Sequence, residues 1–312
     1  MNTGVSRTVP NPKQQIDGVL VVHKPVGPTS HDVVICARRS LGVSRIGHTG
    51  TLDPQASGVL PLVLGQATRL AQHLTASDKE YQAAIRFGVV TDTYDAAGAV
   101  VEESGRVPSR DQVVAALERF VGAFLQIPPL YSAKMVGGER SYVRARSGKP
   151  VQPPAVRVTA HTLELTSFSD AQALVRVRCS AGFYVRSLAH DLGRALGVGG
   201  ILHGLVRTES AGFSLEDAMA FEKLVTAPRA DLLSQVKPIE TLLTDIPAAP
   251  LTQQGVLWAL HGRDLGPAEL VTPLPAIPSL VRMIGPDGRI VGLAEPAKTS
   301  GFLHPAVVFS YN

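Results

Sequence analysis

The chain has 312 residues, of which 45% are hydrophobic and 18% are charged. This composition is typical of a globular protein with a full core, and the length favours one large domain and one small domain. The net charge of +4 is compatible with a polyanionic partner, and the two cysteines, Cys36 and Cys179, lack the number and spacing of a disulfide framework or a zinc site.

The N-terminal segment, residues 1–15, is polar and lacks the hydrophobic core of a secretory signal, so we expect a disordered arm. No apolar run approaches the roughly 20 residues that a helix needs to span a bilayer. Two buried, reduced thiols are the favoured interpretation of the cysteines. Together these features predict a cytoplasmic protein.

Short strands and helices follow one another without a regular order over residues 16–244. A strand over residues 18–22 leads into a Pro/Gly loop, and a helix capped by Ser30 should run to about Leu41 and stop at Gly42. Further strands are predicted over residues 59–64, 80–89, 156–164, 173–179 and 205–211. Further helices are predicted over residues 66–74, 109–120, 182–196 and 214–224. The irregular order predicts an α+β fold with a mixed, largely antiparallel sheet flanked by helices.

The composition changes near Ile246, after which prolines become frequent. Short strands separated by turns are predicted over residues 280–284, 289–294 and 306–310. They indicate a small β-rich domain. We therefore expect an arm over residues 1–15, a large domain over 16–244 and a small domain over 245–312.

A predicted loop over residues 47–58 carries a single carboxylate, Asp53. Glycines on both sides permit backbone conformations that other residues avoid, and Pro54 favours an extended conformation at Asp53. Catalytic groups commonly lie on short loops held by a rigid scaffold. The alternative is that the side chain merely caps a turn, and spacing alone slightly favours that interpretation.

Two other patterns have simple structural interpretations. Asp92 and Asp95 could begin a metal site, but no third acid lies at loop spacing, so a turn with Asx-type capping is favoured. The glycines over residues 197–200 do not form a dinucleotide-binding motif. Nothing in the sequence implies a metal or a cofactor.

Basic residues cluster between Lys134 and Arg157, where the one acid is Glu139. Glycines and prolines within this stretch favour a surface loop. Since arginine suits bidentate phosphate contacts, we expect the loop to bind a phosphate backbone. A solvated basic surface without a ligand remains the alternative. The candidates for backbone contacts are Arg140, Arg144 and Arg146.

The segment RIGHTGTLDP over residues 45–54, followed by ASGVLP over 56–61, closely resembles the signature of the bacterial tRNA pseudouridine-55 synthases, the TruB family of pseudouridine synthases. Segments at matching distances resemble other motifs of that family: residues 18–30, 78–81, 91–95, 127–134 and 179–188. The resemblance covers about residues 17–215. It extends only loosely to the C-terminal part, where the family usually carries a small RNA-binding PUA domain.

The resemblance implies the pseudouridine synthase fold and the isomerisation of uridine-55 in the T loop of tRNA to pseudouridine. Asp53 falls on the catalytic aspartate, Arg186 on the arginine that pairs with it, and Tyr81 on the aromatic residue that stacks on the flipped base. The remaining matches are Tyr184 and Leu205 as walls of the uridine pocket, His48 as an RNA contact and Lys24 as a support for the N-terminal motif. Residues 128–155 fall on a thumb-like RNA-binding insertion.

This reaction requires no redox step and no external atom, so the missing cofactor motifs are consistent with it. The implied partner is the T arm of tRNA, with no membrane and no obligatory protein partner, and the implied state is a monomer. One alternative is a non-catalytic tRNA-binding or folding protein of the same fold, which the intact Asp53 and Arg186 disfavour. Another is the archaeal and eukaryotic relative that works with guide RNA, which the basic insertion disfavours.

Overall fold

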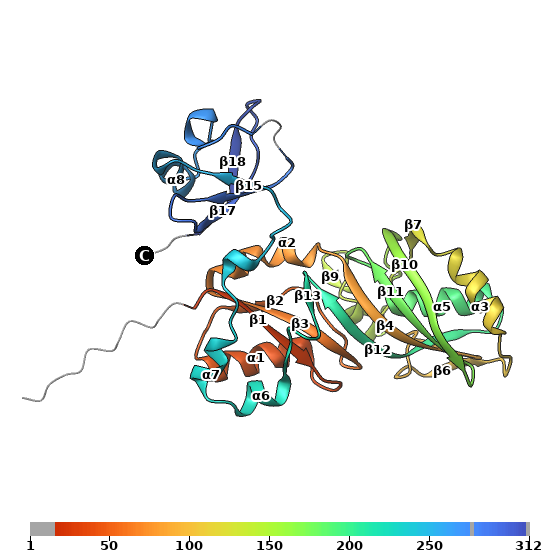
Figure 1. The fold of residues 1–312 in the computed structure, drawn as a ribbon. Helices are drawn as coiled ribbons and strands as arrows, with labels where there is room; N and C mark the ends of the chain where they lie inside the picture. The colour runs from red at the N-terminus through yellow and green to blue at the C-terminus, as the bar shows by residue number, and fades with distance from the viewer. Residues whose placement is uncertain (1–15, 275–277, 310–312) are drawn as a thin grey trace, which may run out of the picture.

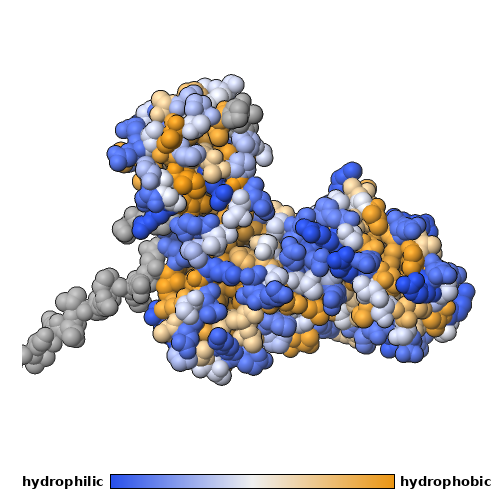
Figure 2. Space-filling model, viewed as in Figure 1, coloured by the Kyte–Doolittle hydropathy of each residue, from blue (hydrophilic) through white to orange (hydrophobic). Residues whose placement is uncertain are grey.

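A computed structural model describes residues 16–274 and 278–309 (Figure 1). The predicted arm over residues 1–15 and the last residue of the predicted strand 306–310 lie outside the described residues. The molecule has an L-shaped outline, in which a C-terminal unit stands on one end of an elongated main body (Figures 1 and 2). None of the helices in the described part of the chain is long and apolar enough to cross a bilayer.

The main body is built on one large sheet, whose strand order is β14-β1-β3-β12-β4-β11-β10-β7. The central strands are β1 (Gly18–Lys24), β3 (Ala56–Leu64), β4 (Lys79–Phe87), β11 (Gln172–Cys179) and β12 (Gly200–Ser210). The outer strands are β2 (Ile46–His48), β7 (Gly122–Gln126), β10 (Val156–Ser169), β13 (Phe213–Ser214) and β14 (Met219–Ala220). Most neighbours are antiparallel, but β12 pairs with β3 and β1 with β14 in parallel. The predicted mixed, largely antiparallel sheet is confirmed.

Helices pack on this sheet through apolar faces. The helices of the main body are α1 (Ser30–Leu41), α2 (Ala71–Thr75), α3 (Arg110–Glu118), α4 (Ser141–Arg146), α5 (Val185–Ala195), α6 (Phe221–Thr226) and α7 (Arg229–Ser234). Leu188 and Leu192 of α5 share a buried cluster with Ala83 and Ile85 of β4. Because β4 alternates buried and exposed residues, the side chains at odd-numbered positions, including Tyr81, face this helix-covered side.

Two 3₁₀ helices and two short hairpins complete the described part of the main body. The 3₁₀ helix η1 (Gly65–Leu70) precedes α2, and η2 (Ile239–Thr241) lies near the end of the main body. The hairpin β5 (Val89–Thr91) and β6 (Val100–Glu103) encloses the turn that carries Asp92 and Asp95. The hairpin β8 (Met135–Val136) and β9 (Glu139–Arg140) precedes α4 in the basic stretch.

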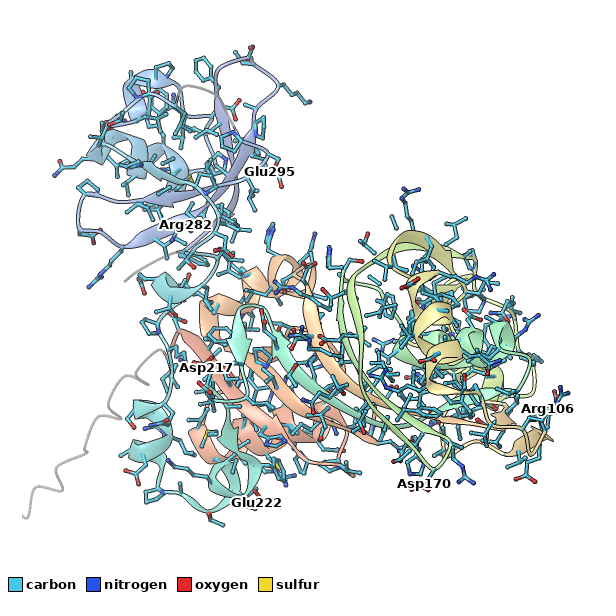
Figure 3. All side chains as sticks on the ribbon, turned by 45° about the vertical axis from the view of Figure 1, so that its right-hand side comes forward. Arg106, Asp170, Asp217, Glu222, Arg282 and Glu295 are labelled. Carbon is cyan, nitrogen blue, oxygen red and sulfur yellow. The ribbon has the colours of Figure 1, made fainter. Side chains whose placement is uncertain are left out.

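The C-terminal unit has its own sheet and core. Its elements are β15 (Ala248–Pro250), α8 (Gln253–Leu260), η3 (Pro267–Glu269), β16 (Val281–Ile284), β17 (Ile290–Pro296) and β18 (Leu303–Val308). Arg282 lies where this unit meets the linker, and its guanidinium donates to the carbonyls of Ile246 and Thr244 (Figure 3). Leu293 and Phe309 join the same apolar cluster as Leu70 of the main body, so the two parts share a small packed contact.

The structure corrects several predicted elements. The cap of α1 is Thr29, whose side chain accepts from the amide of Asp32, while Ser30 bonds to the backbone of Leu52 instead. The predicted loop over 47–58 contains the end of β2 and the start of β3, because Gly47 and His48 pair with β3. The helix predicted over 214–224 is wrong. Pairing of Met219 with Val22 in the sheet holds that part extended, so helix α6 begins at Phe221.

The parallel pairing of β12 with β3 positions the segment around Asp53, and Gly58 makes that pairing possible. Gly58 has φ +114°, and a Cβ there would lie 2.1 Å from the carbonyl oxygen of Arg207 on β12. Gly27 has nearly the same backbone angle, φ +115°, yet a Cβ there would meet nothing within 4 Å. Gly58 therefore permits a close approach of two backbones, whereas Gly27 needs only its conformational freedom.

We predict that Gly58→Ala destabilises the protein by about 1–3 kcal/mol more than Gly27→Ala, because only the first change also overpacks a strand contact. Urea unfolding of both variants and the wild type would measure the difference. Since both substitutions place alanine at a similar positive φ, Gly27→Ala controls for backbone strain. Equal losses of stability would contradict a close approach at Gly58.

Candidate active site

A cavity of about 310 Å³ opens where the loop before β3 and the strands β4 and β12 meet the beginning of α5. It brings together residues that are far apart in the sequence. Of the predicted site residues, those that line it are Asp53, Tyr81, Tyr184, Arg186 and Leu205. Lys79 and Arg207 add two basic side chains to its wall. The cavity is therefore the candidate active site.

Asp53 lies in the short connection between β2 and β3. The backbone of this connection is fixed from outside: Ser30 exchanges hydrogen bonds with both the amide and the carbonyl of Leu52, and the amide of Gly27 donates to the carbonyl of Pro54 at 2.8 Å. The Asp53 side chain itself is 44% exposed. A rigid backbone thus presents a carboxylate that remains open to the cavity.

Arg186, at the start of α5, is only 8% exposed and holds Asp53 directly. Its Nε lies 3.0 Å from Oδ2 of Asp53. The rest of the guanidinium is also bonded: Nη1 donates to the carbonyl of Thr93 at 3.3 Å and Nη2 to that of Tyr131 at 3.0 Å. An arginine held on several sides therefore fixes the position of the carboxylate.

Asp95 is a second carboxylate at Arg186, and sequence reasoning assigned it no role in the site. Its Oδ2 lies 3.6 Å from Nη1 of Arg186. Its Oδ1 accepts from the Thr93 hydroxyl and the Ala97 amide, so the favoured Asx-type turn is also present. The only sequence signal was the resemblance of residues 91–95 to a family segment, because the contact joins a turn to a distant helix. Within the described residues no group of three or more His, Cys, Asp or Glu side chains is arranged to hold a metal ion.

Tyr81 and Tyr184 supply aromatic walls. Tyr81 is 8% exposed, and burial raises the pKa of its hydroxyl, which keeps it a neutral phenol at neutral pH. Tyr184 precedes α5 in an extended conformation, and its backbone exchanges two hydrogen bonds with the Gln126 side chain. Burial raises the pKa of the Tyr184 hydroxyl as well. Leu205 pairs with Ala83 on β4 and Ala56 on β3, beside the two rings.

Lys24 and His48 lie near this cavity but are not among the residues that line it. The Nζ of Lys24 is fully buried and donates to the carbonyls of Pro25 and Ala56, at 2.8 and 2.7 Å. Burial lowers the pKa of Lys24 to about 8, although attraction to Asp53 opposes the shift. The Nδ1 of His48 accepts from the amide of Gly50, and burial lowers the pKa of this imidazole.

The basic candidates Arg140, Arg144 and Arg146 lie together on β9 and α4. Arg140 is exposed, Arg144 lies 3.6 Å from Glu139, and Arg146 lies over the ring of Tyr142. The base of this segment is connected to the cavity, because the carbonyl of Tyr131 accepts from Arg186 and the amide of Tyr142 donates to the carbonyl of Ser132. A ligand bound to these arginines would therefore lie next to the candidate active site.

Comparisons with known proteins show the family to which the chain belongs. A model of the N-terminal domain of TruB family pseudouridylate synthases matches residues 38–185, and a model of the tRNA pseudouridylate synthase B C-terminal domain matches residues 186–244. The chain is 48% identical to tRNA pseudouridine synthase B of Symbiobacterium thermophilum, over 80% of this chain and 83% of that protein. It is 42% identical to tRNA pseudouridine synthase B of an Azoarcus species, over 81% and 85%.

Solved structures share the fold. An H/ACA ribonucleoprotein bound to a substrate RNA containing 2′-deoxyuridine matches with a TM-score of 0.73 and 25% identity, over 94% of this chain and 85% of that chain. A Cbf5-Nop10-Gar1 complex matches with a TM-score of 0.71 and 28% identity, over 95% and 86%. The fold and the sequence matches define a pseudouridylate synthase. The chain belongs to the TruB family.

We predict that Asp95→Asn lowers kcat for pseudouridine formation about tenfold, which corresponds to the loss of about 1.4 kcal/mol from a charge-assisted contact. RNA affinity should change little, because Asp95 is 9% exposed and faces Arg186. Single-turnover kinetics would measure the change in rate. Asp92→Asn is the matched control, since Asp92 lies in the same turn and accepts from the amide of Ala99. Equal rates in the two variants would contradict a role for Asp95.

Proposed function

We propose that this protein isomerises uridine-55 in the T loop of tRNA to pseudouridine, with Asp53 as the nucleophile and without a cofactor. The observation that carries the proposal is the pair of Asp53 and Arg186 in a cavity walled by Tyr81. The family membership and the relatives named tRNA pseudouridine synthase B support the choice of tRNA. The close match of residues 45–61 to the family signature supports uridine-55.

The target base must first leave the RNA stack, which costs a few kcal/mol. A buried tyrosine ring such as that of Tyr81 offers a surface on which the flipped base stacks. This stacking contributes roughly 1–3 kcal/mol and offsets part of the cost of flipping the base out. Tyr184 and Leu205 close the sides of the same cavity. The cavity thus recognises a single extruded pyrimidine better than a base that remains paired.

The chemistry is an isomerisation in which one bond is exchanged for another. The N1–C1′ bond breaks, the base turns, a C5–C1′ bond forms, and the proton on C5 is lost while N1 gains one. A carboxylate nucleophile divides this change into two steps through a covalent intermediate. Arg186 binds one oxygen of Asp53, and the side chain is open to the cavity. This geometry serves attack at C1′ and attack on the base alike.

Binding of the rest of the tRNA is assigned to two further parts of the chain. We propose that residues 128–155 form a thumb that contacts phosphates through Arg140, Arg144 and Arg146. Residues 245–312 are proposed to be a PUA-like RNA-binding domain, and His48 to contact the RNA near the flipped nucleotide. Lys24 is proposed to support the site by holding the backbone at Pro25 and Ala56. The protein is proposed to act as a monomer, without an obligatory protein partner.

The decisive experiment is incubation of the purified protein alone with a T-arm stem-loop, followed by mass-shift labelling of pseudouridine. Conversion at the position of uridine-55 is the expected result. Absence of conversion with tight binding would indicate a non-catalytic tRNA-binding protein. Conversion only after addition of guide RNA and partner proteins would indicate the guide-dependent class.

We predict that Asp53→Asn abolishes turnover and changes RNA affinity by less than roughly tenfold, because the carboxylate is needed for bond chemistry more than for binding. The same T-arm assay and a filter-binding titration would measure both quantities. Asp170→Asn, on an exposed turn between β10 and β11, is the control and should retain activity. Normal turnover by Asp53→Asn would refute the assignment of the nucleophile.

We also predict that replacing Arg140, Arg144 and Arg146 together by glutamine weakens RNA binding and flattens its salt dependence. Each lost phosphate contact should reduce the slope of log K against log salt by about 0.7–0.9. Titrations at several salt concentrations would measure this slope.

The matched control for this experiment is the triple variant of Arg106, Arg110 and Arg119, which are exposed residues in and around α3. It removes the same amount of charge from a surface that the proposal leaves free of RNA. A slope that falls equally in both triple variants would show a general effect of charge and would remove residues 140–146 from the interface.

A further inference from the structure

Arg207 is the largest of the fully buried side chains, with 1% of its surface exposed. It lies on β12, two residues after Leu205, and it lines the cavity. Burial of a cation is costly unless its charge is compensated. Among the described residues no carboxylate lies within salt-bridge distance of its guanidinium. A costly group without an anionic partner, directly at the site, calls for a functional explanation.

Its hydrogen bonds go to both ends of the segment that carries Asp53. Nε donates to the carbonyl of Val59, on β3 after the nucleophile, at 2.8 Å. Nη2 donates to the carbonyl of Gly50, before the nucleophile, at 3.1 Å. The guanidinium therefore clamps the backbone on either side of Asp53.

The glycine at position 50 fits this clamp. Gly50 has φ +138°, and a Cβ there would lie 3.5 Å from Nη1 of Arg207. That distance is an ordinary van der Waals contact, so the loop lies directly against the guanidinium, and the positive φ is what favours glycine at this position.

The same side chain reaches the base-stacking ring. Arg207 and Tyr81 are directly paired across β12 and β4, and both lie on the inner face that lines the cavity. Side chains at directly paired positions lie next to each other, so the positive charge of Arg207 acts on the Tyr81 phenol and opposes the larger effect of burial, which raises the pKa of its hydroxyl.

We infer that Arg207 is a positioning residue for uridine isomerisation: its guanidinium fixes the distance between the ring of Tyr81 and the loop of Asp53. This inference rests on the proposed roles of those two residues. A base stacked on Tyr81 is then presented to the carboxylate in one orientation. Arginine suits the task because two nitrogens of its planar fork hold the carbonyls of Val59 and Gly50 in a fixed geometry while the same side chain lies beside Tyr81.

The test is a double-mutant cycle of Arg207→Lys and Tyr81→Phe in the T-arm assay. Arg207→Lys retains the charge, so KM for the stem-loop should change less than about threefold while kcat falls at least about tenfold. The fold-losses in kcat of the two single variants should not multiply in the double variant, because each substitution removes the same link. We expect the kcat of the double variant to differ from the product of the single effects by at least about threefold. Independent effects in the cycle, or an unchanged kcat in Arg207→Lys, would overturn the inference.

Two controls separate positioning from stability. Arg229→Lys also removes a guanidinium contact to a backbone carbonyl, that of Leu41 at the end of α1, but Arg229 does not line the cavity, so this change should lower the melting temperature without lowering kcat. If Arg207→Lys does not fold, Tyr81→Phe alone tests the link, and an unchanged kcat in that variant overturns the inference. Wild-type conversion of the stem-loop is measured alongside; its absence would count against the proposed function instead.

Discussion

The ion pair between Arg186 and Asp53 is the contact on which the rest of the site depends. A single buried guanidinium meets the loop of Asp53, the turn of Asp95 and, through the carbonyl of Tyr131, the base of the basic segment. Movement in any of these parts would therefore change the position of the Asp53 carboxylate. Because the arginine begins helix α5, which packs in the core against β4, its position is set by the fold itself.

Backbone carbonyls, more than acids, compensate the cations around this pair. Lys24 and Arg207 are both fully buried, and their cationic groups donate to backbone carbonyl oxygens: Lys24 to those of Pro25 and Ala56, and Arg207 to those of Gly50 and Val59. Such bonds offset part of the desolvation cost and also fix the backbone that accepts them. Had carboxylates taken their place, extra negative charge would surround Asp53 and repel a polyanionic ligand. The loop is thus held rigid while Asp53 remains the exposed acid in the cavity.

Sequence reasoning found the parts of the site that lie in contiguous motifs. The segment around Asp53, the strand of Tyr81 and the beginning of α5 each carry a local pattern, and the structure brings Asp53, Tyr81 and Arg186 into one cavity. Asp95 and Arg207 were assigned no role, because their contacts join strands and turns that only the tertiary fold brings together. The helix predicted over residues 214–224 was wrong for a related reason, since pairing of Met219 in the sheet outweighs local propensity.

The distribution of charge explains how a carboxylate can lie in a cavity that is proposed to bind a polyanion. An RNA phosphate near Asp53 would repel it, yet Arg186, Arg207 and Lys79 surround the same cavity. Burial and repulsion by Arg207 lower the pKa of Lys79 to about 8, so this lysine keeps its charge at neutral pH and loses it as the pH rises through 8. Below that value, cations outnumber the carboxylate along the cavity wall. The wall of the cavity is therefore positive around a single exposed acid, as the proposed binding of a nucleotide requires.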